Sequence, residues 1–150
     1  MDTSEIIMQD AMQLPLEVVL VRLGAAILLG AAIGIEREAR SRPAGLRTHI
    51  LVCLAACLFT LIGTELFLRF EPQGNMDPTR IIEAVTSGVA FLAAGTIIRG
   101  EKGVRGLTTG AGMWMAGAVG VAAGSGLLIL AALSTCAAVV VIALIRLVEP

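Results

Sequence analysis

Polar residues of the kind that bind anions gather at two points of an otherwise apolar chain. The segment RPAGLRTH (42–49) holds two arginines, a threonine and the chain's only histidine. The segment VRGLTTG (104–110) places Arg105 before Thr108 and Thr109. Guanidinium groups bind carboxylates and phosphates through paired N–H donors, and threonine hydroxyls add further donors. Both segments therefore indicate recognition of an anionic group.

Each segment precedes a long apolar run, so each is expected to begin a helix. The first N–H groups of a helix lack internal partners and carry partial positive charge, which favours an anion there. Glu36, at the end of the preceding helix, is expected to orient Arg47 or His49, and His49 can titrate near neutrality. The predicted anion-, lipid- or partner-binding site comprises Glu36, Arg37, Arg42, Arg47, Thr48, His49, Arg105, Thr108 and Thr109. The alternative is that these arginines only set topology and contact headgroups nonspecifically.

A second set of polar residues is expected at the opposite ends of the helices: Arg22, Glu65, Asp77, Arg80 and Glu83. Arg22 falls inside an apolar stretch, where an ionisable group is costly and normally paired, and Glu65 or Glu83 is its expected partner. Asp77 is a good helix N-cap residue. A structural ion pair is the favoured interpretation, with an ion pathway as the alternative. Apart from a weak Mg²⁺ site among the carboxylates, no metal site and no cofactor are expected.

The composition is that of a membrane protein. Of the 150 residues 57% are hydrophobic and 15% charged, and the mean hydropathy is +0.89. Several windows have the roughly 20 apolar residues that cross a bilayer. We expect an all-α, polytopic membrane protein forming one transmembrane domain over residues 1–150. The five helices are predicted at about 16–36, 46–70, 78–99, 107–123 and 127–147. The net charge of −1 gives no support for a nucleic-acid partner.

The distribution of basic residues orients these helices. Lysine and arginine concentrate in the first and third connections, over residues 37–47 and 99–105, and are scarce elsewhere. Since cytoplasmic loops carry the excess of basic residues, the N-terminus is expected outside and the C-terminus in the cytoplasm.

Small residues recur at helical spacing and indicate close helix packing. Gly30 and Gly34 form one such face, and Ala116, Gly120 and Gly124 form another. Such faces serve either packing within the chain or a homo-oligomer interface. A shift of 61 residues also aligns GLRT (45–48) with GLTT (106–109), which would suit the parallel repeats of some transporters. No metalloprotease or nucleophile-elbow motif is present, so the chain is not expected to be an enzyme.

Three blocks of this sequence resemble the MgtC/SapB family of bacterial inner-membrane proteins. They are GAAIGIEREARSRPAGLRTHILV, DPTRIIEAVTSGVAFLAAGTIIR and VRGLTTGAGMWMAGAVGVAAGSG, and the resemblance covers about residues 18 to 145. The positions that match the family blocks are Glu36, Arg37, Arg42, Pro43, Gly45, Arg47, Thr48, Asp77, Pro78, Arg80, Gly95, Arg105, Gly106, Thr108 and Thr109. Family members often have glycine at positions 90 and 93 and glutamine near 84, where this chain has alanine.

The resemblance implies a multi-pass protein of the bacterial inner membrane that regulates rather than catalyses. The best-known members are linked to Mg²⁺ homeostasis, to adaptation to low Mg²⁺ and to survival inside host macrophages, and the resemblance implies the same link here. It implies the membrane subunits of the F-type ATP synthase as one candidate partner, and from the residues we also expect membrane lipids as partners and a homo-oligomer. Longer members continue into a small cytosolic domain, which we expect this chain to lack. A small ion transporter or channel is the alternative function.

Overall fold

The computed structural model of the chain describes residues 12–70, 77, 79–101 and 103–148. Over these residues the chain is mostly helical, as the sequence predicted, with five helices and one two-stranded hairpin. The elements in chain order are α2 (Leu16–Glu38), α3 (Leu46–Phe70), α4 (Thr79–Gly95), β1 (Ile98–Gly100), β2 (Gly103–Arg105), α5 (Leu107–Gly124) and α6 (Leu128–Val148). The four longest helices begin and end within two residues of the predicted bounds.

The third predicted helix ends earlier than expected, and a β-hairpin follows it. The helix was predicted to reach residue 99, but α4 ends at Gly95, and the Thr96 hydroxyl donates to the Ala93 carbonyl at 2.7 Å. Strands β1 and β2 then pair antiparallel, with Ile98 opposite Arg105. Hydroxyl bonds to preceding carbonyls and β-branched residues both favour leaving the helix here.

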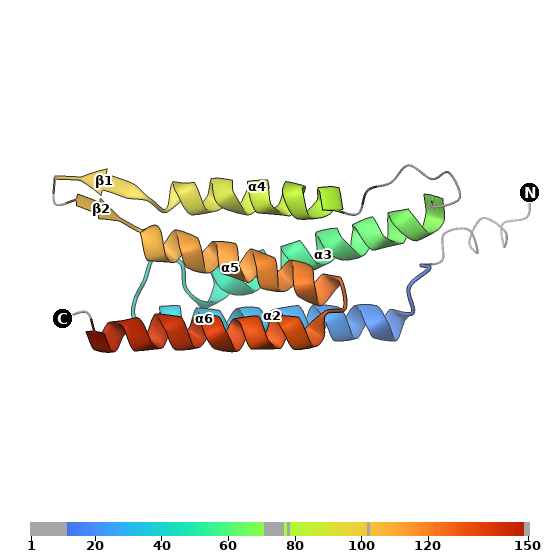
Figure 1. Ribbon diagram of the computed structural model, residues 1–150, viewed down its shortest axis with the longest axis horizontal. Helices are drawn as coiled ribbons and strands as arrows, with labels where there is room; N and C mark the ends of the chain where they lie inside the picture. Colours follow the sequence, from blue (N-terminus) through green and yellow to red (C-terminus); the bar gives the residue numbers. More distant parts are fainter. Residues whose placement is uncertain (1–11, 71–76, 78, 102, 149–150) are drawn as a thin grey trace, which may run out of the picture.

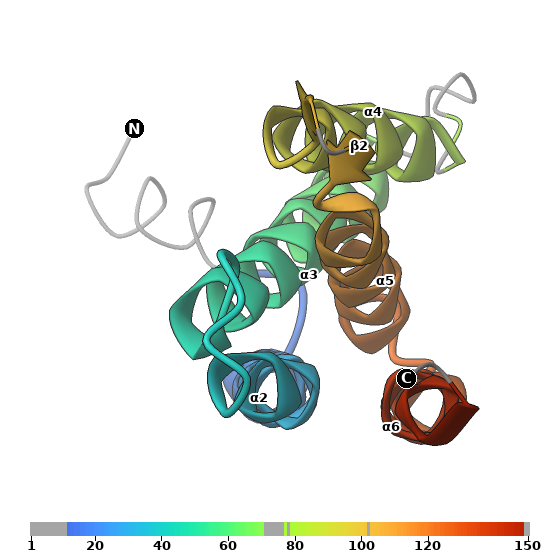
Figure 2. The same cartoon turned by 90° about the vertical axis from the view of Figure 1, so that its left-hand side faces the viewer.

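The helices run along the long axis of the molecule in alternating directions (Figure 1). α3 and α5 occupy the middle of the bundle, α2 packs most extensively on α3, and α6 packs on α2 and α5. α4 lies on the other side and packs more closely on α5 than on α3 (Figure 2). The core between the helices consists of small and apolar residues, among them Cys53, Ala56, Ala116 and Val119.

The glycine faces are used for packing within the chain. A Cβ added at Gly30 would lie 2.9 Å from the Cβ of Cys53 on α3, and one at Gly34 would lie 2.8 Å from the Cα of Leu46. A Cβ at Gly120 would overlap the Cys53 carbonyl, and one at Gly124 would lie 2.7 Å from the Cys57 carbonyl. Backbones therefore approach at these positions as closely as only glycine permits.

The 61-residue repeat has a partial counterpart in the fold. GLRT and GLTT each begin a helix, α3 and α5, at the same end of the bundle. The aligned glycines, however, differ: Gly34 is in close contact with α3, whereas a Cβ at Gly95 would meet nothing within 4 Å. The two helix pairs share a direction but do not pack alike.

Two of the described helices, α2 and α3, are long and apolar enough to cross a membrane. Only 22% of the apolar stretch of α2 and 39% of that of α3 are buried inside the molecule. Leu28, Phe59, Phe91 and Ile129 are among many large apolar side chains that are mostly exposed. A soluble protein rarely exposes such continuous apolar surface, so this surface suits lipid.

Candidate functional site

The predicted binding residues lie at one end of the bundle. The connection over residues 39–45, the hairpin formed by β1 and β2, and the first turns of α3 and α5 all lie at this end, on the left in Figure 1 and facing the viewer in Figure 2. We call this region the basic end. Its exposed arginines are Arg42, Arg47, Arg99 and Arg105. None of these four makes an ion pair or a side-chain hydrogen bond with the part of the chain that the structure describes.

A buried hydrogen bond joins α2 to α5 beneath this rim. Arg37, near the end of α2, donates from Nη2 to the hydroxyl oxygen of Thr109 at 2.9 Å. The two residues are 4% and 2% exposed. A guanidinium removed from water needs such a partner, because an unpaired buried charge is costly. Thr109 therefore holds Arg37 in place rather than facing solvent, and Thr108 beside it is exposed.

His49 is fully buried between α2, α3 and α5. Its Nδ1 lies 2.9 Å from the Gly45 carbonyl, so Nδ1 carries the proton that this bond requires. Its Nε2 faces α5, because a Cβ added at Gly112 would lie 3.1 Å from that atom. With Nδ1 protonated in the neutral ring, Nε2 is an acceptor directed at the backbone of α5.

Four polar atoms of this cluster are buried without a hydrogen-bond partner among the described residues: Glu36 Oε1 and Oε2, Arg37 Nε and His49 Nε2. Of these atoms, Glu36 Oε1 forms an ion pair with Arg40, one turn later in the chain. Buried polar atoms are nearly always hydrogen-bonded, to water if not to protein. The cluster of Glu36, Arg37, His49 and Thr109 can thus accept and donate further hydrogen bonds beyond those it makes internally.

The two helix N-termini at the basic end differ, which the sequence did not predict. At α3, the backbone N–H of Leu46 already donates to a carboxylate oxygen of Glu38 at 3.0 Å, so an anion of the chain occupies that position. At α5 the N-cap residue is Gly106, with φ of +90° and no side-chain cap. The uncapped N–H groups are therefore at the start of α5, beside Thr108 and Arg105.

The opposite end of the bundle corrects one expected pairing. Arg22 pairs with neither Glu65 nor Glu83: its Nη1 donates to the Gly124 carbonyl at 2.7 Å, at the last residue of α5. A cation is well placed there, because the C-terminal carbonyls of a helix are partly negative. Arg22 and Arg37 of α2 thus hold the two ends of α5.

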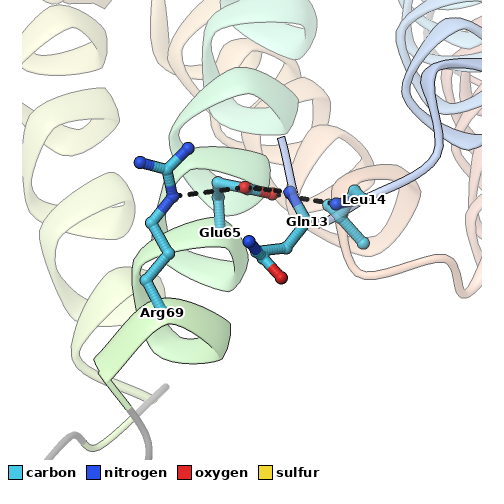
Figure 3. Close-up of polar contacts among 4 residues, drawn as sticks. All are labelled: Gln13, Leu14, Glu65 and Arg69. Carbon is cyan, nitrogen blue, oxygen red and sulfur yellow. Dashed lines mark hydrogen bonds and ion pairs between the residues drawn. The ribbon is translucent and has the colours of Figure 1, made fainter. Parts of the chain in front are cut away.

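Glu65 anchors the segment that precedes α2 (Figure 3). Its carboxylate accepts the backbone N–H groups of Gln13 and Leu14, the latter at 3.1 Å, and pairs with Arg69 at 3.4 Å. The sequence predicted no role for Gln13 or Arg69, although the spacing of four between Glu65 and Arg69 is typical of helical ion pairs. Glu65 is therefore occupied by contacts that stabilise the fold.

Asp77 caps α4 as predicted. Its Oδ1 accepts from the Thr79 hydroxyl at 2.7 Å and from the Thr79 N–H at 2.9 Å, and these bonds hold the pKa of the carboxyl below its ordinary value. Arg80 and Glu83 are exposed, and Pro78 lies outside the described residues. No group of three or more metal-binding side chains occurs in the described ranges, so Glu65, Asp77 and Glu83 do not converge there.

Comparison with known proteins adds the family. The model of the MgtC family matches residues 23–150. The chain belongs to the MgtC family. The Brucella abortus protein MgtC is 42% identical over 124 residues, which cover 83% of this chain and 50% of that protein. Bacillus subtilis SapB is 39% identical over 111 residues, 72% of this chain and 48% of SapB.

A third relative carries a functional name. The Escherichia coli K12 protein called "Putative magnesium transporter YhiD" is 39% identical over 111 residues, 72% of this chain and 51% of YhiD. The chain thus spans about half the length of the curated relatives it matches. No solved structure matches this MgtC-family chain.

The matched family residues divide into two layers in this MgtC-family chain. Four of the nine predicted binding residues are exposed at the basic end: Arg42, Arg47, Arg105 and Thr108. Three are buried below them, Arg37, His49 and Thr109, while Glu36 and Thr48 are half-buried. Gly112, which faces His49, and Glu38, which caps α3, were not predicted. Their roles depend on which helices meet, and no local pattern in the sequence encodes that.

Proposed function

We propose that this MgtC-family chain is a regulatory integral membrane protein linked to Mg²⁺ homeostasis and adaptation to low Mg²⁺. It acts without catalysis, by binding an anionic group of a membrane partner or a lipid at the basic end. Its relatives include a protein named as a magnesium transporter, YhiD, which supports the connection with Mg²⁺. The basic end supplies the binding chemistry.

One observation carries this proposal: exposed arginines without an ion-pair partner lie at the same end of the bundle as a helix N-terminus that has no side-chain cap. Arg42, Arg47 and Arg105 are exposed and have no ion-pair partner in the described chain. Gly106 leaves the first N–H groups of α5 without a side-chain cap. A carboxylate or phosphate would find charge-assisted donors there from both side chains and backbone.

The buried cluster gives this surface a rigid base. Arg37 and Thr109 join α2 to α5, and the His49 ring lies against Gly112. Binding groups that are held by packing lose less entropy when they engage a partner. An anionic group that reached the cluster would also accept a hydrogen bond from Arg37 Nε, which has no partner among the described residues.

We further propose that all five helices span the bacterial inner membrane, with the N-terminus outside and the basic end in the cytoplasm. Both basic connections lie at one end of the bundle, which supports this orientation by the positive-inside rule. An acidic cytoplasmic segment of another membrane protein suits the basic end, and the F-type ATP synthase membrane subunits are one such partner. A homo-oligomer is part of the same proposal.

A small ion transporter or channel is the second candidate, favoured by the name of the relative YhiD, "Putative magnesium transporter". The residues in the middle of the bundle give little support to a transporter or channel. Between the buried cluster and Arg22 the described core is made of Cys53, Ala56, Val119 and other apolar or small residues. Transported ions need polar groups along their path.

Complementation distinguishes these two functions. In a bacterium whose own family member has been deleted, growth in low Mg²⁺ is compared for the parent chain, Arg47→Ala, Arg105→Ala and Arg99→Ala. We expect Arg47→Ala and Arg105→Ala to abolish complementation at unchanged membrane levels, and Arg99→Ala to retain it. Full growth with both Arg47→Ala and Arg105→Ala would refute binding at the basic end. Mg²⁺ flux through the purified parent in vesicles would favour the transporter.

A further inference from the structure

An apolar groove of about 590 Å³ runs between α3 and α4, from Arg80 in the first turn of α4 to Leu92 near its end. α4 contacts α3 sparsely and lies mainly on α5, which leaves the groove open along α3. Phe59 and Leu66 of α3 and Ile81 and Leu92 of α4 are among its lining residues. Arg80 is the one charged residue among the described residues that line it.

The position of Arg80 is unfavourable for the stability of α4 itself. It lies in the first turn of α4, where the partly positive helix terminus repels a cation. It is exposed, and it makes no ion pair or side-chain hydrogen bond with the described residues. The carboxylate of Asp77 lies close enough to interact with it electrostatically but is engaged by Thr79. Arg80 and the start of α4 therefore favour the same kind of ligand, an anion.

We infer that this groove binds one phospholipid of the leaflet at the Arg80 end, with an acyl chain along α3 and α4 and the phosphate at Arg80. From Arg80 to Leu92 the groove follows α4 for about 18 Å at 1.5 Å per residue. Half of a hydrocarbon core is about 15 Å. The apolar lining thus extends over one leaflet and has its cation at one end, which is the polarity of a phospholipid.

The chemistry of the groove suits an acyl chain. Its lining is apolar except for Arg80, and an alkyl chain fits along it because carbon atoms pack about 4 Å apart. The single cation at one end of an apolar groove complements a ligand with one anionic end and an apolar remainder, which a phospholipid is.

Gly88 offers a way to fill the groove without disturbing the fold. It lines the groove, and a Cβ added there would meet nothing within 4 Å. Leucine at this position would place its side chain in the volume assigned to the acyl chain and would raise helix propensity. Gly24 of α2 also has open space around it but does not line the groove, so Gly24→Leu is the matched control.

The test is native mass spectrometry of the full chain in mild detergent, titrated with palmitoyl-oleoyl phosphatidylglycerol or the diacylglycerol with the same chains. We expect Gly88→Leu to weaken binding of both by about tenfold, and Gly24→Leu to bind as the parent does. Arg80→Gln should weaken phosphatidylglycerol about fivefold, the effect of one cation near an anionic headgroup, and leave diacylglycerol unchanged. Arg99→Gln, at the other end of the molecule, should change neither.

Parent-like lipid binding by Gly88→Leu would overturn the inference, as would equal losses in Gly24→Leu and Gly88→Leu. A change in oligomeric mass of Gly88→Leu with lipid binding intact would mean that a polypeptide covers the groove. Arg80→Gln replaces an exposed side chain, so its result does not depend on refolding of the core. Because the groove is tested at Arg80 and Gly88 and the basic end at Arg47 and Arg105, either proposal can fail without the other.

Discussion

At the residue scale, the fold depends on a few polar side chains that each find a partner on another helix. Arg37 and Arg22 both belong to α2, yet they bind the first and last turns of α5. They are 15 residues apart in α2, as are their partners Thr109 and Gly124 in α5, so two helices of opposite direction match in length. The sequence marked all four positions as polar or small, but their pairing follows only from the packing of α2 beside α5.

The bond between Arg37 and Thr109 should contribute measurably to stability. Thr109→Val keeps the shape of the side chain and removes the hydroxyl acceptor, which leaves a buried guanidinium unpaired. We expect a loss of about 2 kcal/mol in the free energy of unfolding in detergent, while Thr109→Ser remains close to the parent. Thr108→Val, at the exposed neighbour, should stay within about 0.5 kcal/mol. Equal stability of Thr109→Val and Thr108→Val would show that the bond contributes nothing.

The cap of α4 should weaken in acid. Bonds from the Thr79 hydroxyl and N–H lower the pKa of Asp77 below its ordinary value of 3.8. A carboxyl with a lowered pKa stabilises the folded state at neutral pH and loses that contribution as the pH falls through its folded pKa, below 3.8. The protection factors of the amides in the first turn of α4, which correct for the intrinsic pH dependence of exchange, should therefore fall below that pH in the parent. In Asp77→Asn these protection factors should be nearly independent of pH, and a parent-like fall in this variant would assign it to another group.

At the scale of elements, the helices were predictable and the connections were not. Long apolar runs closed by polar residues fix where a helix can lie, so α2, α3, α5 and α6 matched their predicted bounds. The β-hairpin was missed because its strands have three residues each, too few to show alternation. The different capping of α3 and α5 was missed because Glu38 reaches α3 only after the chain has turned.

Glycine contacts between α3 and α5 give a sharp test of the packing. In Gly120→Ala the new Cβ overlaps the Cys53 carbonyl of α3, and because this neighbour is backbone the helices must separate. We expect a loss of about 1–3 kcal/mol in unfolding free energy. Gly24→Ala makes the same chemical change where nothing lies within 4 Å, and it should gain up to about 1 kcal/mol from helix propensity. The account of the bundle would be wrong if Gly120→Ala were as stable as Gly24→Ala.

At the scale of the whole molecule, two chemically different ends follow from the alternation of helix direction. One end gathers both basic connections, and the other holds Arg22, Glu65 and Asp77 in contacts that secure the fold. The sequence predicted this division from basic residues alone. It also predicted the capping role of Asp77, but it did not predict that Arg22 and Glu65 bind backbone groups, because no side-chain pattern in the sequence marks such partners.

The division predicts how the molecule sits in the membrane. With Cys53, Cys57 and Cys136 replaced by alanine, single cysteines are introduced at Ser41, in the first basic connection, and at Ser125, after α5. We expect a membrane-impermeant maleimide added to intact cells to label Ser125→Cys but not Ser41→Cys, and lysed membranes to label both. The reverse pattern would place the basic end outside and contradict the proposed orientation.

The most direct test of the central claim, that the basic end binds an anionic partner, is native mass spectrometry of the chain extracted gently from its own membrane. The parent should carry an acidic membrane protein or an anionic lipid that Arg47→Ala combined with Arg105→Ala releases, whereas Arg99→Ala keeps it. Lipid retained in the groove is distinguished by its loss in Gly88→Leu. A parent that carries neither partner nor lipid at the basic end, or a double variant that keeps its partner, would contradict the account.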